Sequence, residues 1–184
     1  MRPPRLQTSR LLLREWRDED LEPFVALNDD AEVTRFLRGG NGYTREDSLE
    51  RFAHMRDHWA ERGYGLFATE LRTTGSFIGF VGVEDPVFLP EVMPSVEIGW
   101  RLARDVWGQG LATEAATEVL RWSFEELGLD RIVSVIHPDN TASIRVAEKL
   151  GMHRWLDTVH PAYGHGLVVF ESFAPGGKQE SSTE

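Results

Sequence analysis

The sequence predicts one α/β (α+β) domain built on a central mixed sheet, and three observations support this class. Residues 96–127 change from strand-like alternation to helical spacing, and residues 131–137 are again strand-like, so a helix connects two parallel strands. Two alternating segments at 64–71 and 77–83 flank a short turn, which indicates a β-hairpin. Hydrophobic residues make up 41% of the 184 positions, enough for one compact core, which we place in residues 1–173.

The composition excludes several classes of function. The absence of cysteine removes disulfides, thiolate zinc sites and a cysteinyl acyl-enzyme. A net charge of -10 without clustered Lys and Arg argues against nucleic acid as a partner; it favours a cationic substrate or simply keeps the surface soluble. No apolar segment is long enough to span a membrane, and the N-terminus lacks the apolar core of a signal peptide. We therefore expect a cytoplasmic protein with no membrane partner.

The first 63 residues are expected to hold one strand and a set of helices. The strand is predicted over Leu6–Trp16, and acidic residues from Asp18 onward open a helix. A second short helical piece over Asn28–Leu37 ends in a glycine-rich loop. A longer amphipathic helix follows over Arg45–Arg62, capped by Thr44 at its start and stopped by glycine at its end.

The predicted hairpin leads through a loop into the central strand of the domain. The loop, Glu84–Pro94, contains three prolines that cannot donate ladder hydrogen bonds, so the next strand should start near Ser95. This strand, Val96–Leu102, feeds a helix that begins at Leu111 and ends before Gly128.

The connection between that strand and its helix contains two glycines, in the sequence Trp107-Gly108-Gln109-Gly110. Such a loop at a helix N-terminus presents unpaired amides and the positive end of the helix dipole, which favour a phosphate; alternatively, the glycines serve only the turn. There is no P-loop lysine and no third glycine three residues after Gly110, so neither a P-loop nor a dinucleotide fingerprint is present.

The C-terminal third should contain three strands and one helix. Arg131–His137 is typical of a buried strand, and a helix over Thr141–Leu150 follows, with Asp139 or Asn140 as its N-cap. Two final strands are predicted, and the polar tail, residues 174–184, is expected to be disordered. The two strands are Met152–Val159 and Gly166–Phe173.

Two motifs carry a resemblance to a known family. The segment W-G-Q-G-L-A-T-E-A from Trp107 resembles the acetyl-CoA pyrophosphate loop of the GNAT N-acetyltransferases, in particular their RimJ/RimL-like branch. Gly110 and Ala112 match the general pattern [RQ]-x-x-G-x-[GA], whereas Trp107 replaces Arg or Gln, as is familiar in that branch. The segment N-T-A-S-I-R-V-A-E-K-L-G-M from Asn140 resembles the branch signature N-x-x-S with K-L-G-[FM], and the opening T-S-R-L-L-L-R resembles its start.

The resemblance implies a fold, an activity and a cosubstrate. It implies the GNAT fold, with a splayed, largely antiparallel mixed sheet of six to seven strands and about four helices. It also implies direct transfer of an acetyl group from acetyl-CoA to a primary amine, of a protein N-terminus or a small molecule, while homodimer formation stays open. The residues expected to bind acetyl-CoA are Ile98, Gly99, Trp100, Trp107, Gly108, Gln109, Gly110, Leu111, Ala112, Thr113, Asn140 and Ser143.

Two residues are expected to carry the chemistry. Glu97, just before the loop, stands where relatives place a catalytic carboxylate that deprotonates the amine; the alternative is a surface salt bridge with Arg101. Backbone N–H groups at 98–100 would stabilise the oxyanion. Ala147 occupies the position of the tyrosine that many relatives use as an acid, which leaves the Ser143 hydroxyl as the donor to the leaving thiolate.

The helical pair and the histidines each allow two interpretations. The predicted helical pair would lie over the acceptor cleft, with Phe36–Thr44 contacting the acceptor, or would form a plain surface hairpin. His137 lies beside the predicted cleft in either a structural or a functional role, and no histidine spacing indicates a metal site. The rival to an enzyme is a non-catalytic acyl-CoA sensor that keeps the loop without turnover.

Overall fold

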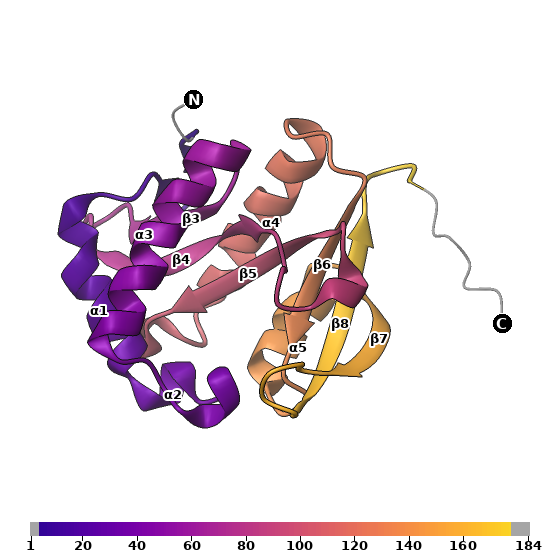
Figure 1. The fold of residues 1–184 in the computed structure, drawn as a ribbon. Helices are drawn as coiled ribbons and strands as arrows, with labels where there is room; N and C mark the ends of the chain where they lie inside the picture. Colours follow the sequence, from indigo (N-terminus) through magenta and orange to yellow (C-terminus); the bar gives the residue numbers. More distant parts are fainter. Residues whose placement is uncertain (1–3, 178–184) are drawn as a thin grey trace, which may run out of the picture.

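The computed structural model describes residues 4–177, which form one sheet with helices on both faces (Figure 1). The sheet has eight strands in the order β1-β2-β3-β4-β5-β6-β8-β7. All neighbouring strands are antiparallel except β5 and β6, which are parallel, as the predicted crossover requires. The strands are β1 (Leu6–Gln7), β2 (Leu11–Arg14), β3 (Leu66–Leu71), β4 (Phe77–Glu84), β5 (Val96–Leu102), β6 (Arg131–Ile136), β7 (His153–Val159) and β8 (Gly166–Phe173).

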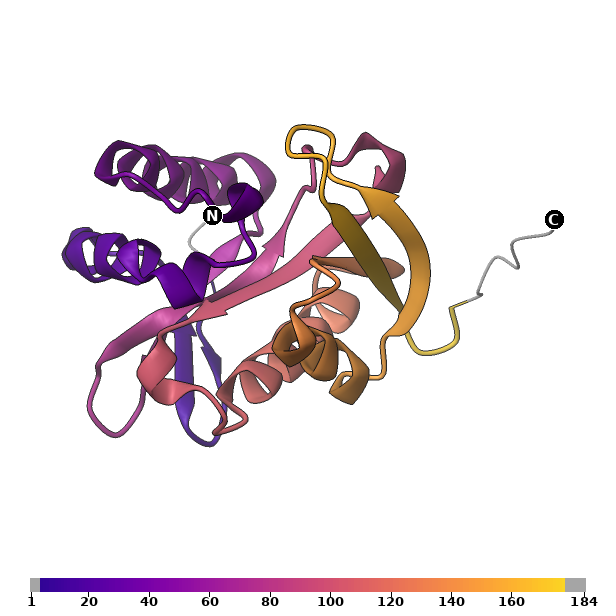
Figure 2. The same cartoon turned by 90° about the horizontal axis from the view of Figure 1, so that it is seen from below.

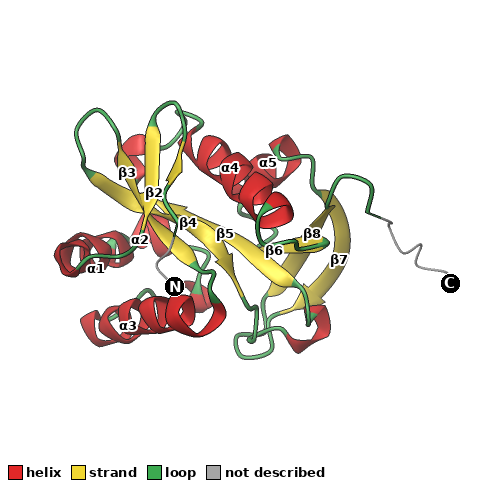
Figure 3. Ribbon diagram, turned by 90° about the horizontal axis from the view of Figure 1, so that it is seen from above, coloured by secondary structure: helices red, strands yellow, loops and turns green. Residues whose placement is uncertain are grey.

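The helices fall on the two faces of the sheet. Helices α1 and α3 lie against one face, and α4 and α5 lie against the other (Figures 2 and 3). The main hydrophobic cluster runs from Leu6 to Phe170 and joins both layers to the sheet. The α-helices are α1 (Leu21–Asp29), α2 (Ala31–Thr34), α3 (Arg45–Arg62), α4 (Leu111–Glu125) and α5 (Thr141–Lys149); single 3-10 turns occur at Asp18–Asp20, Arg38–Gly40, Pro90–Val92 and Arg104–Val106.

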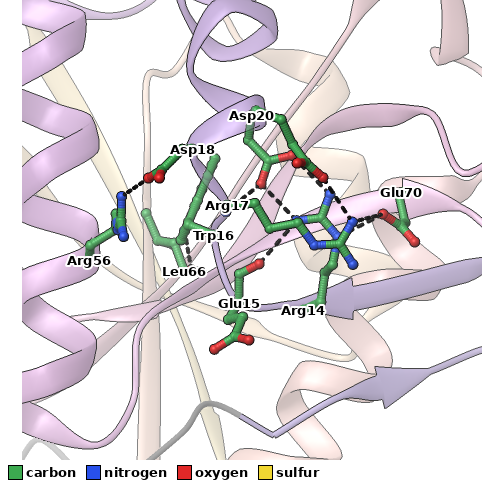
Figure 4. A network of polar contacts seen from close by, with 10 residues as sticks. Arg14, Glu15, Trp16, Arg17, Asp18, Asp20, Arg56, Leu66 and Glu70 are labelled. Atoms are coloured by element: carbon green, nitrogen blue, oxygen red, sulfur yellow. Dashed lines mark hydrogen bonds and ion pairs between the residues drawn. The ribbon is translucent and has the colours of Figure 1, made fainter.

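A buried guanidinium fastens the N-terminal helices to the sheet (Figure 4). Arg14 on β2 donates two hydrogen bonds to Asp20, at 2.7 and 2.9 Å, and a third to Glu70 on β3 at 2.6 Å. Asp20 also accepts the backbone N–H of Arg17 at 2.8 Å, which fixes the chain where it turns toward α1. A buried charge is tolerated only when its hydrogen-bonding groups are satisfied. This network therefore specifies how the helical layer packs against the sheet.

The expected fold class is confirmed, with corrections of detail. The single strand predicted over Leu6–Trp16 is wrong, because the chain turns at residues 8–10 and forms the antiparallel strands β1 and β2. This turn explains the eighth strand, and the predicted second helical piece is the separate helix α2, so residues 4–177 contain eight strands and five α-helices, where the resemblance implied six to seven and about four. Most of the tail predicted to be disordered, residues 178–184, lies outside the described residues.

The predicted strands after residue 63 and the long helix α3 hold within two residues, whereas the piece predicted over Asn28–Leu37 is only Ala31–Thr34, and residues from Asp18 form a 3-10 turn before α1. Thr44 caps α3 through its hydroxyl, which accepts the N–H of Asp47, and Gly63 ends the helix with φ 75°. Asn140, one of the two candidates, is the N-cap of α5, because its side-chain oxygen accepts the N–H of Ser143. No helix within residues 4–177 is both long enough and apolar enough to cross a bilayer.

Candidate active site

The site is organised by a gap between the two parallel strands β5 and β6. These strands pair only at Val96 with Ile132 and Glu97 with Val133, and beyond this point they diverge (Figure 1). On its other edge, β5 stays paired with β4 from Glu97 to Leu102. The strand edge of β5 that faces β6 is therefore free of sheet pairing from Ile98 onward, as the sequence-based oxyanion hypothesis for residues 98–100 requires.

Glu97 lies at the apex of this gap and extends into it. One carboxylate oxygen accepts the backbone N–H of Val135 on β6 at 3.2 Å, a hydrogen bond that takes the place of strand pairing. Burial raises the pKa of Glu97 to about 8, and the negative charge of Glu84 adds to the rise, whereas the Val135 N–H opposes it. The carboxyl thus titrates near neutral pH, the range in which a general base is effective.

The surface salt bridge considered for Glu97 is wrong. Arg101 lies on the same face of β5 but donates to the Asn28 amide oxygen and, at 3.3 Å, to the Tyr43 hydroxyl. Its guanidinium also lies over the Tyr43 ring, with Cζ 4.9 Å from the centroid. These partners on α1 and on the loop before α3 draw Arg101 away, so Glu97 keeps no ion-pair partner among residues 4–177.

A second carboxylate stands beside Glu97 on the α1/α3 face. Glu84 on β4 is the register partner of Glu97, so the two side chains project to the same side of the sheet. Arg51 of α3 forms an ion pair with Glu84; it forms none with Glu97, although its charge lowers the pKa of Glu97 somewhat. Sequence patterns miss this acid pair, because the register between β4 and β5 decides which residues become neighbours.

The opposite face of the sheet carries Ser143. Trp100 projects from β5 toward α5, and its indole N–H donates to the Ser143 hydroxyl oxygen at 3.2 Å. The Ser143 backbone N–H donates to Asn140 at 3.1 Å, so Asn140 acts as the helix cap. Since the hydroxyl oxygen already accepts from Trp100, its own O–H is free to donate to another group. Ala147, one turn further along α5, is fully buried.

The glycine loop has the backbone that anion binding needs. Gly108 and Gly110 have φ values of 73° and 77°, in the left-handed region that favours glycine, and Gly110 caps α4. A Cβ added at Gly108 or Gly99 would meet no atom within 4 Å, so both positions are open. Leu111 is buried in the core, whereas Trp107 is 47% exposed and donates its indole N–H to the Leu102 carbonyl at 2.8 Å. Of the candidate binding residues on β5, Trp100 therefore faces α5, whereas Gly99 lies on the same face as Glu97 and Arg101.

Aromatic and imidazole rings gather where three loops meet at the end of β6. The His137 ring lies 5.2 Å from Phe36 and 5.0 Å from His165, measured between centroids. His165 lies 5.2 Å from His160, which in turn lies 4.6 Å from Tyr163. The segment Phe36–Thr44 therefore touches the end of β6 through Phe36 and reaches β5 through Tyr43. Within residues 4–177, these imidazoles are not part of a group of three or more metal-ligand side chains.

The arrangement of the site suits one class of enzyme. The glycine loop on one face suits phosphate groups, and the carboxylate on the other face can accept a proton. Because the strand gap joins the two faces, the arrangement suits a transferase with a phosphorylated acyl donor. Comparison with known proteins agrees: residues 10–153 match the family model described as an acetyltransferase (GNAT) domain. The chain belongs to the GNAT acetyltransferase family, whose members use acetyl-CoA.

Three similar proteins illustrate this membership. The uncharacterized protein YkkB of Bacillus subtilis (strain 168) is 36% identical over 152 residues, which cover 81% of this chain and 85% of YkkB. The uncharacterized N-acetyltransferase YoaA of the same organism is 31% identical over 82% of this chain and 84% of its own. The crystal structure of the acetyltransferase from Agrobacterium tumefaciens str. C58 aligns with a TM-score of 0.80 at 28% identity, covering 94% of this chain and 95% of that chain.

Proposed function

We propose that this acetyltransferase moves the acetyl group of acetyl-CoA directly to the primary amine of a protein N-terminus or a small molecule, as a RimJ/RimL-like enzyme. The observation that carries the proposal is the Glu97 carboxyl in the gap between β5 and β6, with its pKa raised to about 8 and no competing ion pair among the described residues. It is the base that an amine acceptor requires, because an ammonium ion has no lone pair with which to attack.

The acceptor is proposed to enter from the α1/α3 face. There Glu97 takes a proton from the incoming ammonium, while Glu84 and its partner Arg51 shape the charge around it. Tyr43 and the ring cluster around His137 form the outer wall of this entrance. Both acidic and basic groups face the entrance, so the charge of this wall does not select between a peptide and a small-molecule amine.

Acetyl-CoA is proposed to lie on the α4/α5 face. The residues there fit such a group: the amides at Gly108 and Gly110 suit its phosphates, and the free edge of β5 from Ile98 to Trp100 suits its pantetheine amides. When bound, it supplies a thioester carbonyl that an amine can attack. The Ser143 hydroxyl, held by Trp100, then donates to the departing sulfur.

The assignment to the RimJ/RimL-like branch rests on sequence motifs and on their placement. Thr8–Arg14 forms the β1–β2 turn and β2, and Asn140 and Ser143 open α5 beside the gap. Ala147 supports the assignment, because its buried position gives no room for a tyrosine acid and leaves Ser143 as the donor on this face.

The proposal is tested by measuring CoA release from acetyl-CoA with a panel of amines that includes N-terminal peptides, polyamines and aminoglycosides. Glu97→Gln is compared with the parent, and calorimetry measures CoA affinity in both. We expect turnover with at least one amine, a loss of roughly 10²–10⁴ in rate for Glu97→Gln and unchanged CoA affinity. Tight CoA binding without turnover of any amine would instead support an acyl-CoA sensor.

A further inference from the structure

The β1–β2 turn touches the glycine loop from the far end of the sequence, and we propose that Arg10 is a positioning residue for the acyl donor. Arg10 holds the loop in shape, balances the charge of Glu114 and offers its remaining N–H groups to the phosphates of CoA. This inference rests on the proposed function, and it assigns a role in that site to a residue outside the loop.

Glu114, in the first turn of α4, anchors the turn. Its carboxylate accepts hydrogen bonds from the Thr8 hydroxyl at 2.5 Å, the Ser9 hydroxyl at 2.9 Å, the Arg10 backbone N–H at 2.9 Å and Arg10 Nε at 2.6 Å. Burial alone would raise its pKa, but the hydrogen bonds from Thr8, Arg10 and Ser9 outweigh burial and lower the pKa of Glu114 to about 2. Glu114 therefore stays charged at every pH at which the protein works.

Arg10 connects this anchor to the loop. While Nε faces Glu114, Nη1 donates to the Gln109 carbonyl at 3.0 Å, immediately before Gly110. Nη2 has no acceptor among residues 4–177 and lies 3.8 Å from the position that a Cβ of Gly110 would take. The side chain of Arg10 is 48% exposed, so these N–H groups remain accessible to a ligand at the loop.

The charge at this position explains why an arginine is needed. A carboxylate in the first turn suits the helix dipole, but the uncompensated charge of Glu114 would repel phosphates bound at the same helix end. Arg10 balances that charge and at the same time donates a hydrogen bond to the Gln109 carbonyl. The three donors of a lysine sit on one nitrogen and lack the planar fork of arginine, so a lysine cannot bond both Glu114 and Gln109 with a fixed geometry.

The turn offers a matched control on its other side. Arg72 donates through Nη1 to the carbonyls of Thr8 and Ser9, at 2.8 and 3.0 Å. It thus supports the same turn, and among the described residues its side chain donates to these two carbonyls and not to Gln109 or Gly110. Arg72→Gln weakens the turn without removing the proposed contact, so it separates a general loss of structure from a specific effect on the donor.

The experiment compares the parent, Arg10→Gln, Arg10→Lys and Arg72→Gln with two acetyl donors. Acetyl-CoA carries the phosphates, and S-acetylpantetheine carries none. For Arg10→Gln we expect the KM for acetyl-CoA to rise roughly tenfold to a hundredfold, the effect of losing a hydrogen bond to a charged group, with kcat unchanged. Its kcat/KM for S-acetylpantetheine should equal that of the parent. The KM of Arg10→Lys for acetyl-CoA should lie between those of the parent and Arg10→Gln. Arg72→Gln should match the parent with both donors.

A parent-like KM for acetyl-CoA in Arg10→Gln overturns the proposal, and so does an equal loss with both donors. Adding Glu114→Gln to Arg10→Gln should recover part of the affinity, because it removes the uncompensated charge. Calorimetric CoA affinity is measured on the same variants, so the comparison stands even if no amine in the panel is acetylated. If Arg10→Gln does not fold, a parent-like affinity of Arg10→Lys for CoA and for dephospho-CoA overturns the role of the guanidinium fork.

Discussion

Replacing Glu97 by Gln should lower activity and at the same time stabilise the folded protein at neutral pH. The carboxyl has an ordinary pKa of 4.5 and a pKa of about 8 in the folded chain. Between these values the unfolded chain loses this proton while the folded chain keeps it, so the free energy of unfolding falls as the pH rises. Glutamine resembles the protonated carboxyl in shape and does not titrate, so the variant lacks this decline.

The magnitude follows from the interval between the two pKa values. The interval from the ordinary pKa of 4.5 to pH 7 is about 2.5 pH units. At about 1.4 kcal/mol per unit, the free energy of unfolding of the parent falls by about 3.5 kcal/mol over this interval. Below pH 4.5 the carboxyl is protonated in both states, so the free energies of unfolding of the parent and the variant should change together. The expected signature is therefore a stability difference that grows between pH 4.5 and pH 8 and then levels off.

Urea unfolding of the parent and Glu97→Gln, measured at intervals from pH 4.5 to pH 8.5, gives this difference directly, since residual differences in packing do not depend on pH. Glu50→Gln, on the exposed side of α3, serves as the control for removing an ordinary carboxylate. Equal pH dependence in the parent and Glu97→Gln would contradict a raised pKa and, with it, the physical basis for Glu97 as the base.

Three further predictions concern the glycine loop, α5 and the buried arginine. Gly110→Val should abolish CoA binding in calorimetry and reduce stability by about 1–2 kcal/mol, because valine is strained at a φ of 77°. Ser143→Ala should slow acetyl transfer in single-turnover kinetics by roughly tenfold to a hundredfold, and adding Ala147→Tyr should not restore it, because Ala147 is fully buried. Asp20→Ala should lower the urea-derived stability by about 3–5 kcal/mol without changing CoA affinity, because it leaves the Arg14 guanidinium buried with half its partners.

Local chemistry explains which parts of the fold can be predicted. Helix α3 is predictable because Thr44 and Gly63 mark its ends, and the β5–α4–β6 crossover is predictable because the spacing of apolar residues changes at Leu111. The turn at residues 8–10 has only a weak signal, because Thr8 and Ser9 favour a turn less strongly than glycine, proline or asparagine. Its shape depends on Glu114 and Arg72, which lie far away in the sequence.

Only those parts of the candidate site that lie within one continuous segment can be predicted from the sequence. Glu97 and the glycine loop lie within a single continuous segment, so the sequence predicts both. The neighbours that set the chemistry of Glu97 come from other elements: Glu84 through the register of β4, and Val135 through the divergence of β6. The bond from Trp100 to Ser143 and the clamp of Arg10 on Gln109 likewise join segments separated by 43 and 99 residues. A pattern within one segment cannot reveal such contacts.

The position of Glu97 makes the strand gap a compromise between stability and activity. If β5 and β6 stayed paired, the Val135 N–H would serve the sheet and no carboxylate would be needed there. Because the strands diverge, the Glu97 carboxylate accepts a single hydrogen bond among the described residues, from the Val135 N–H. In a half-buried position one hydrogen bond is not enough to keep the pKa of Glu97 low. The charged form of Glu97 therefore lacks further hydrogen-bond donors within residues 4–177. This raises its pKa toward the working range, and it also lowers the stability of the folded chain at neutral pH. A second hydrogen-bond donor introduced near Glu97 should therefore stabilise the protein and shift its activity to lower pH, with a lower maximal rate because the base would be weaker.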